Sequence, residues 1–588
     1  MLVMPAEVRW IIHNCAPDLT SGALQQWGSI NVIPLNVQTS SRHNTTRLRR
    51  TQMKTFATNS ASAAKRPHCL LVTGVILGLW LGVMNGPWAL TTICHAEEAP
   101  VFSKLWGENG ELWSPQSRLP DFSFAGYRWG QEAYRIPRES ISVKDFGAKG
   151  DGQTDDTAAF KKAIVAGRGK LILIPPGRYV LSDILFVRTS NTVLRGAGPD
   201  KTFLVFVKPG VEIDPRPSKT DGNQPTTNWS WAGGLISIGG SRQEPKDLVK
   251  VLRTQQRGDL QLTLEKNPFR AGDEILLTLR DDEKNSLLNY LYRGQPGDIS
   301  GLKNWFVDQV FRVVKVEGRT ITLNRPLRFD VRPDWQPTVE RFAPPLTDVG
   351  VEGITFDFPV RQYAGHFKEI GFNPVEITRY AAHCWVKDVV IRNADNGPFV
   401  SGYFCTLEGL RFEADAGRLS SSGQYAGHHG VTFGRALDCL CRNFEVNTRF
   451  IHDLTVQSSI GCVFCSGRGL DLCFDHHRWA PYENLFADID AGAGRRLFAS
   501  SGGGMRGNHT AGGETFWCIR TEQPVRWPKS LGIDAINLVG LNVSDALEAV
   551  STLPAATELT GRWCESFPPE RIQPQNLFEA MHKRAQSR

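Results

Sequence analysis

One short pattern recurs along the second half of the chain and limits what the chain can fold into. A polar residue is followed by Asp, Gly or Asn and then by alternating apolar residues, in VEGITFDF (351–358), WVKDVVIRNAD (385–395), TLEGLRFEAD (406–415), LCRNFEV (440–446), FIHDLTV (450–456) and YENLFADID (482–490). Such alternation predicts a short β-strand with one buried face. No single strand can bury that face alone, and no long helical stretch separates the segments. The sequence therefore predicts a solenoid of stacked coils.

An N-terminal stretch narrows the type of solenoid. ISVKDFGAKGDGQTDDTAAFKKAI (141–164) predicts a strand, a glycine-rich turn and a helix, and KLILIPPGRYVL (170–181) predicts two short strands around a turn. Residues 141–207 closely resemble the N-terminal entry of the pectate lyase superfamily, whose rhamnogalacturonase- and epimerase-like members are right-handed parallel β-helices. The resemblance implies an all-β fold with a capping helix at the N-terminal end. It also implies a structural role for the aspartates of the turn, which are Asp151, Asp155 and Asp156.

A different pattern interrupts the coils between about residues 241 and 345. FRAGDEILLTL (269–279) and DQVFRVVKVEGRTITLNRPLRF (308–329) alternate as antiparallel hairpins do, with a turn at Glu317-Gly318. We therefore expect an antiparallel β module inserted into a parallel β-helix that spans residues 141–565. The alternation leaves open whether the module forms a wall of a substrate groove or only covers the side of the solenoid.

The segments on either side of the coils have their own character. Residues 97–140 are rich in Trp, Phe and Tyr, which predicts an aromatic arm packed on the N-terminal helix. Residues 566–588 are expected to form a peripheral C-terminal tail.

The first 96 residues are typical of an export leader. Lys65-Arg66 precede an apolar run at 69–84, and small residues follow at 94–96, as in a cleaved signal peptide. The run is short for a membrane span, although an uncleaved anchor is the alternative. Because Met53 begins a signal of ordinary length, it is the expected true start. The mature protein is then secreted, periplasmic or on the cell surface, with no stable membrane span.

The charge of the chain is concentrated in this leader. The formal net charge is +7, but nearly all of it comes from residues 1–96, and the remainder is close to neutral. A neutral body gives no support to a nucleic-acid partner.

The cysteines allow two interpretations. Nine of the 12 lie beyond residue 380, and an exported protein could oxidise them. Cys462-x-x-Cys465 is half of a metal or redox motif, but no second half exists. We favour the interpretation that the cysteines are small apolar residues stacked inside strands.

Histidines mark the region in which chemistry is expected. His428, His452 and His476 follow one another at intervals of 24 residues, which is about one coil. Equal coils would stack the three on one face at the same level. A 23-residue alignment, which places His429 beside His452, fits equally well. Since strand neighbours point to opposite sides, one member of each adjacent pair, His428-His429 and His476-His477, should face a groove.

Cleavage of an acidic polysaccharide by β-elimination fits these residue types. The reaction must neutralise a uronate carboxylate, remove the C5 proton and protonate the leaving oxygen, which arginine, histidine and tyrosine can do. The candidate catalytic residues are His428, His429, His452, His476, His477, Arg449 and Asp475. The candidate substrate-binding residues are Arg468, Arg478, Tyr425, Tyr482 and Trp479, with Trp517 as a further aromatic platform.

Two other functions remain open. A glycoside hydrolase would need two carboxylates, for which Asp453, Asp471, Asp475 and Asp488 are available. GHHGV (427–431) resembles the Gly-His-Gly of polygalacturonases, but the paired aspartates and the Arg-Ile-Lys of that group are missing. A glycan-binding adhesin is the non-catalytic alternative, although adhesins usually repeat one motif many times.

The sequence assigns no metal ligands. His428, His452, His476 and Asp475 offer nitrogen and oxygen donors for a transition metal, without any paired metal motif. The family resemblance implies Ca²⁺ as a possible cofactor that bridges carboxylates to a uronate. The oligomeric state is left open.

Overall fold

The computed structural model describes most of the chain after the leader. The described residues are 99–588, apart from 131–132, 242, 550–551 and 588. The predicted signal peptide and the start at Met53 lie outside them. No helix in the described part is long and apolar enough to cross a membrane.

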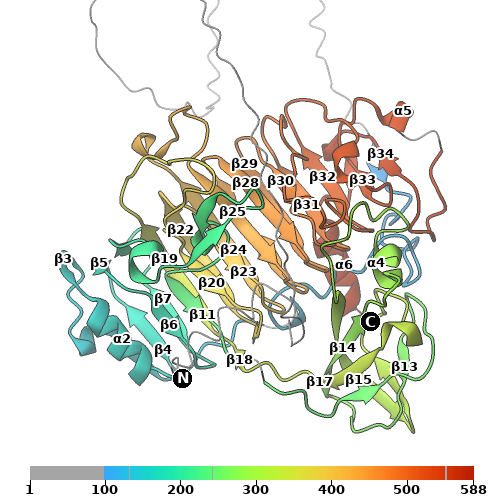
Figure 1. Ribbon diagram of the computed structural model, residues 1–588, viewed down its shortest axis with the longest axis horizontal. Helices are drawn as coiled ribbons and strands as arrows, with labels where there is room; N and C mark the ends of the chain where they lie inside the picture. Colours follow the sequence, from blue (N-terminus) through green and yellow to red (C-terminus); the bar gives the residue numbers. More distant parts are fainter. Residues whose placement is uncertain (1–98, 131–132, 242, 550–551, 588) are drawn as a thin grey trace, which may run out of the picture. The chain divides into compact units, whose positions relative to one another are not determined.

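The described chain is a right-handed parallel β-helix, as the recurring strands and the N-terminal resemblance predicted (Figure 1). Two parallel sheets follow the stack of coils. The seven-stranded sheet contains β6 (Leu185–Val187), β11 (Ile236–Ile238), β20 (Val375–Ile377), β23 (Phe399–Val400), β25 (Gly427–Gly434), β28 (Phe450–Gln457) and β30 (Phe474–His476). The sixteen-stranded sheet contains β2 (Ser140–Ser142), β3 (Asp151–Asp155), β4 (Leu171–Ile174), β5 (Gly177–Leu181), β7 (Val193–Gly196), β8 (Thr202–Phe206), β19 (Gly350–Asp357), β22 (Trp385–Arg392), β24 (Thr406–Glu413), β26 (Leu440–Arg442), β27 (Glu445–Val446), β29 (Val463–Gly469), β31 (Leu485–Asp490), β32 (Thr515–Arg520), β33 (Asn537–Val539) and β34 (Trp563–Glu565).

A single residue with left-handed backbone bends the chain at one corner of coil after coil. β19 pairs with β7 before Gly353 and with β8 after it, because Gly353 has φ +66°. The corner residues of the successive coils are Gly353, Asp388, Gly409, Asn443, Ser466, Asp488, Cys518 and Gly540. Gly tolerates this conformation best, and Asp and Asn adopt it more readily than most residues. In four of the six recurring segments the Asp, Gly or Asn therefore marks a corner of the solenoid, at Gly353, Asp388, Gly409 and Asn443.

The cysteines are part of the core. All nine beyond residue 380 are free thiols, and all but Cys564 are buried. Cys384, Cys405, Cys439 and Cys462 occupy the same level of successive coils, where the Cys405 amide lies 3.3 Å from the Cys439 sulfur. This confirms their interpretation as stacked apolar residues.

A short helix, α2 (Thr157–Ala166), lies at the N-terminal end of the stack (Figure 1). Its Phe160 is fully buried and packs edge-on against Tyr179. The preceding turn is held by carboxylates: Asp156 accepts from the amides of Lys149 and Gly150, and Asp151 accepts from the amide of Thr154. These bonds give the aspartates the structural role that the resemblance implied.

The inserted segment forms its own antiparallel sheet, as predicted. In sheet order it contains β12 (Val249–Lys250), β17 (Thr338–Arg341), β14 (Glu274–Arg280), β15 (Phe306–Glu317), β16 (Thr320–Leu323) and β13 (Gln261–Thr263). Gly318, with φ +62°, makes the turn between β15 and β16. A short helix, α4 (Ser286–Leu291), is part of the same module.

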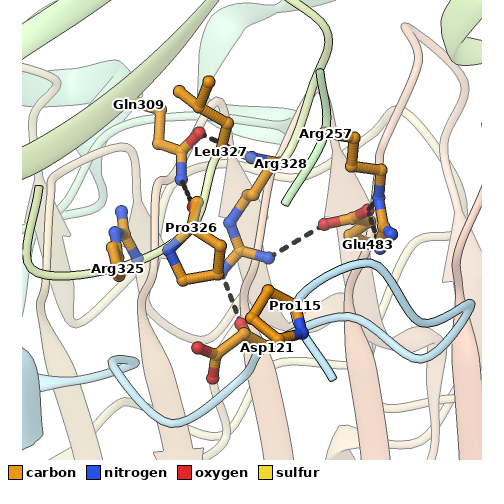
Figure 2. Close-up of a pocket in the computed structure, with 9 residues that line it drawn as sticks. All are labelled: Pro115, Asp121, Arg257, Gln309, Arg325, Pro326, Leu327, Arg328 and Glu483. Carbon is orange, nitrogen blue, oxygen red and sulfur yellow. Dashed lines mark hydrogen bonds and ion pairs between the residues drawn. The ribbon is translucent and has the colours of Figure 1, made fainter. Parts of the chain in front are cut away.

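A buried ionic network fixes this module to a second corner of the coils. Arg325 and Arg328 lie 2.6 and 2.7 Å from the two carboxylate oxygens of Asp438, and Arg328 also lies 3.2 Å from Glu483. Arg257 binds the other oxygen of Glu483 at 3.0 Å. Figure 2 shows the small polar pocket that these arginines and Glu483 line. Buried charges are stable only when they are paired, so the network holds the module in one position.

The aromatic arm does not pack on the N-terminal helix. Trp106, Trp113 and Phe122 instead share a core with Trp517 of the sixteen-stranded sheet and with the C-terminal helix α6 (Leu577–Gln586). The sheet carries outward-facing apolar side chains at this place, and burying them is favourable. The segment after residue 566 is accordingly a packed element, not the peripheral tail that the sequence suggested.

His383 predicts a measurable pH dependence of stability. It is buried beside Phe404, and burial lowers the pKa of its imidazole to about 3 from 6.5. The unfolded chain therefore binds one more proton than the folded protein between these values, so stability falls as the pH drops below 6.5.

We expect the wild type to lose about 2 kcal/mol more than His383→Asn between pH 7 and pH 5. Asparagine tolerates the positive φ of this position and does not titrate. Urea midpoints of the two proteins at both pH values measure the difference. Parallel losses in the two proteins would show that His383 is not the source.

Candidate active site

Three neighbouring strands of the seven-stranded sheet carry an outward-facing polar row. In β25, β28 and β30 the register pairs Thr432 with Thr455 and Thr455 with Asp475. The residues on either side of this row point into the core; they are Val431, Leu454 and Phe474 before it, and Phe433, Val456 and His476 after it. The row is the floor on which the candidate site is built.

The equal 24-residue spacing of the histidines is wrong as a guide to stacking. Val431 pairs with Leu454, 23 residues later, but Leu454 pairs with Phe474, only 20 residues later. His429 therefore lies beside His452, as the 23-residue alignment has it. His476 aligns with Val456 and points into the core, where its Nε2 lies 3.2 Å from Glu514 among Phe486 and Phe516. His477 takes the outward position instead.

Five imidazoles meet above the polar row. They are His366, His428, His429, His452 and His477, contributed by β25, β28, the end of β30 and the segment between β19 and β20. Ring centroids are 4.0 Å apart for His428 and His429, 5.0 Å for His429 and His452, and 5.8 Å for His452 and His477. We call this set the histidine cluster.

One end of the histidine cluster is a carboxylate–imidazole pair. His477 Nδ1 lies 2.9 Å from Asp475 Oδ2, and the Ser501 hydroxyl lies 2.9 Å from the same nitrogen. The Ser501 amide donates to Asp475 Oδ1 at 2.8 Å. A carboxylate at Nδ1 holds the N–H on that nitrogen, which leaves the Nε2 lone pair of His477 free to accept a proton.

The other end of the histidine cluster is oriented by a backbone carbonyl. His428 Nδ1 lies 2.8 Å from the carbonyl oxygen of Ser230, to which it donates, and its Nε2 lies 2.8 Å from Nε2 of His366. Glu369 sits behind this imidazole, 3.5 Å from Nδ1, and accepts from the hydroxyl of Tyr363 at 2.6 Å. Burial raises the pKa of Glu369 to about 7.

Burial sets the charge of the histidine cluster. It lowers the pKa of His452 to about 4, and together with the neighbouring imidazoles it holds the pKa of His428 and of His429 well below the ordinary value. Burial alone would raise the pKa of Asp475, but His452, His477 and the Ser501 amide hold it below its ordinary value. At neutral pH the site therefore contains an ionised Asp475 together with His428, His429 and His452 as uncharged imidazoles.

Several residues predicted from the sequence lie away from the histidine cluster. Tyr482 is fully buried and lies beneath the inserted module, against Phe329. Trp517 is fully buried and donates to the Pro574 carbonyl, so it cannot stack on a sugar. Arg468 is on β29 of the other sheet, where it pairs with Glu445. The strand pattern predicted the β-strands that carry these side chains, but not the face of the solenoid on which each side chain lies.

The remaining predicted residues are close in sequence to members of the histidine cluster, but their side chains contact other parts of the protein. Arg478 donates to the backbone carbonyls of Gly502 and Gly507 and so orders the loop that follows β31. Trp479 is half-buried, with its ring 6.1 Å from Trp305 of the module. Tyr425 and Arg449 are half-buried at the starts of β25 and β28. Tyr425 lies under the guanidinium of Arg496, and the buried Nε of Arg449 has no hydrogen-bond partner in the described part of the chain.

The aspartates considered for hydrolysis do not form a pair in the histidine cluster. Asp453 is buried, pairs with Arg496 and accepts from the Cys473 amide. Asp471 accepts from the Arg495 amide, and Asp488 is a corner residue of the other sheet. Asp475 is therefore the one of the four that takes part in the histidine cluster.

Three participants were missed by sequence reasoning. His366 comes from an irregular segment without strand pattern, and Glu369 follows three residues later. Ser501 is part of the SGGG run. The composition of this run indicated a functional region but did not single out Ser501. No periodicity links these positions to the coils, so proximity to the histidines appears only in three dimensions.

The donor set does not fit calcium. Ca²⁺ takes six to eight oxygen ligands, whereas the histidine cluster offers mainly imidazole nitrogens. Asp475, its carboxylate, is already bound to His477 and Ser501. No step of the chemistry at this site is therefore assigned to calcium.

Comparisons with known proteins find similarity over part of the chain. Residues 140–215 match the family model described as rhamnogalacturonase A/epimerase, pectate lyase-like. The chain is 29% identical over 185 residues to plasmin and fibronectin-binding protein A of Streptococcus pneumoniae, a match that covers 29% of this chain and 23% of that protein. It is 45% identical over 100 residues to the pre-neck appendage protein of Bacillus phage B103, covering 17% of this chain and 11% of that protein.

An enzyme is also among the relatives. Alginate lyase 7 of Azotobacter vinelandii is 41% identical over 75 residues, which are 11% of this chain and 9% of that protein. The chain thus matches less than a quarter of the length of each of these relatives. Among solved structures, the tailspike gp49 of Pseudomonas phage LKA1 has a TM-score of 0.32 at 13% identity, covering 68% of this chain and 64% of that one. Residues 140–215 are thus similar to the pectate lyase-like family, and the stack of parallel coils has the right-handed parallel β-helix fold.

Proposed function

We propose that the protein is an exported polysaccharide lyase whose histidine cluster cleaves a uronate-containing chain by β-elimination. The observation that carries the proposal is the pair formed by Asp475 and His477, at 2.9 Å. Asp475 is the last member of the row of outward-facing polar side chains that crosses the strands of three coils. A solenoid face of this kind suits an extended chain substrate.

His477 is the catalytic base in this proposal. Its Nε2 removes the proton from C5 of the uronate, the electron pair forms the C4=C5 double bond, and the C4–O bond breaks. The resulting imidazolium returns the proton to the leaving oxygen on the same face of the sugar. Asp475 remains ionised and stabilises the imidazolium, as the carboxylate does in other acid–base triads.

Two further observations favour elimination over hydrolysis. The candidate aspartates do not form the pair of carboxylates that a hydrolase needs, since Asp453 and Asp471 are bound to arginines or amides. One relative is named alginate lyase 7, and the substrate of this chain is proposed to be acidic because β-elimination needs a uronate carboxylate.

The test is incubation of the purified protein with alginate, polygalacturonate, hyaluronan and, as a neutral control, a β-glucan. A lyase produces the ultraviolet absorbance of unsaturated uronate ends with an acidic chain and not with the glucan. New reducing ends without that absorbance would instead establish a hydrolase. Retained binding without either product would establish a glycan-binding solenoid, as the relationship to a named binding protein allows.

A further inference from the structure

Three members of the histidine cluster converge on one point from separate segments of the chain. His366, His428 and His452 each direct a ring nitrogen to this point, and the three nitrogens lie within 4.8 Å of one another. His428 and His452 are almost completely buried, whereas His366 is exposed on the segment between β19 and β20. The point therefore has a rigid base of two imidazoles and one adjustable imidazole on the solvent side.

The hydrogen bonds prepare His428 to be a ligand. Because its Nδ1–H donates to the Ser230 carbonyl, its Nε2 carries the lone pair, and this lone pair faces Nε2 of His366 at 2.8 Å. Metal-bound histidines commonly donate their other N–H to a carbonyl or carboxylate in this way. Glu369 lies behind the same imidazole, and its Oε2 is buried with no hydrogen-bond partner from the residues that the structure describes.

His452 adds an independent observation. His452 is 5% exposed, and its Nδ1 has no hydrogen-bond partner among the described residues, with Asp475 Oδ2 3.7 Å away. Leaving a buried polar nitrogen unpaired costs free energy, typically about 1–3 kcal/mol. Coordination of a cation by Nδ1 of His452 would remove that cost.

We propose that His366, His428 and His452 bind a divalent transition metal ion of the zinc class, with its fourth position open on the solvent side, where His366 lies. Imidazole nitrogens select such ions over calcium and magnesium, and three protein ligands with one open position are typical of a catalytic site. Metal–nitrogen bonds of about 2.0–2.1 Å need the nitrogens further apart than 2.8 Å, so exposed His366 moves outward on binding.

The open position has a role if the proposed lyase function is correct. A uronate carboxylate bound there would be neutralised by the cation, which acidifies the C5 proton next to it. His452 is adjacent to His477, with ring centroids 5.8 Å apart, so the carboxylate and the base would act on the same sugar. This role rests on the proposed function, whereas binding of the metal does not.

Binding is tested on the full chain, stripped with a chelator and titrated with Co²⁺ and Zn²⁺. We expect the visible absorbance of tetrahedral Co²⁺ and a calorimetric binding isotherm with Zn²⁺. His366→Ala, whose side chain is exposed, should weaken Zn²⁺ binding at least about 100-fold without changing the melting temperature of the metal-free protein. His428→Ala and His452→Ala should abolish the Co²⁺ spectrum.

His582→Ala is the matched control, because His582 lies on α6, far along the chain in a different core, and should leave the spectrum unchanged. A Co²⁺ spectrum that is absent, or that His366→Ala leaves intact, overturns the metal site. Binding without any activity on acidic chains would support the metal site and refute the lyase. Activity on acidic chains that persists after chelation, with no metal bound, would support the lyase and refute the metal site.

Discussion

Replacing His477 by alanine is expected to lower the turnover of an acidic polysaccharide by about 10²–10⁴-fold, the usual contribution of a positioned acid–base group. The imidazole is 21% exposed and has no role in the core, so the variant should fold normally. The measurement is the rate of appearance of unsaturated uronate ends, with circular dichroism and thermal melting as checks of folding. His582→Ala, on α6, should keep wild-type turnover.

Asp475→Asn tests the positioning residue of the same pair. An amide can donate to His477 Nδ1 and so favours the wrong tautomer, with the proton on Nε2. We expect kcat to fall while KM stays within a few-fold, because Asp475 acts through His477 and not on the sugar. A rise in KM at constant kcat would instead make Asp475 a binding residue. Full activity of His477→Ala would show that His477 is not the catalytic base.

Asp438→Asn is expected to destabilise the protein by about 3–5 kcal/mol, the usual cost of removing one partner from a buried ion pair. Asp438 is completely buried and, among the residues that the structure describes, carries the only carboxylate in an ion pair with Arg325, while Arg328 keeps Glu483. Asparagine has the same shape and tolerates the positive φ of this corner, so the loss comes from the unpaired guanidinium. Denaturant unfolding followed by tryptophan fluorescence measures the change.

The matched control for this prediction is Asp183→Asn. Asp183 pairs with Lys161 in solvent, with both side chains about 40% exposed, and such pairs contribute no more than about 1 kcal/mol. If Asp438→Asn unfolds at the same denaturant concentration as Asp183→Asn, the network does not fix the module.

Local chemistry explains which parts of the fold were predictable. Gly353, Asp388, Gly409 and Asn443 tolerate a left-handed backbone, so the corners of these four coils were predictable from the sequence, whereas those at Ser466 and Cys518 were not. The hairpin of the module was predictable because alternation and the Gly318 turn act over a few residues. The position of the aromatic arm was not, because an apolar segment can cover any apolar face within its reach.

The sequence by itself determined the repeating strands, the inserted antiparallel module and the enrichment of histidines in a few coils. Only the tertiary structure decided which histidines meet. The 20-residue coil pairs His476 with Val456, whose side chain points into the core, so His476 is buried and the next residue, His477, takes the outward position. His366 and Ser501 joined them from irregular segments whose place no repeat prescribes. The strands of a solenoid are determined by short local patterns, whereas its site depends on how coils of unequal length align with one another.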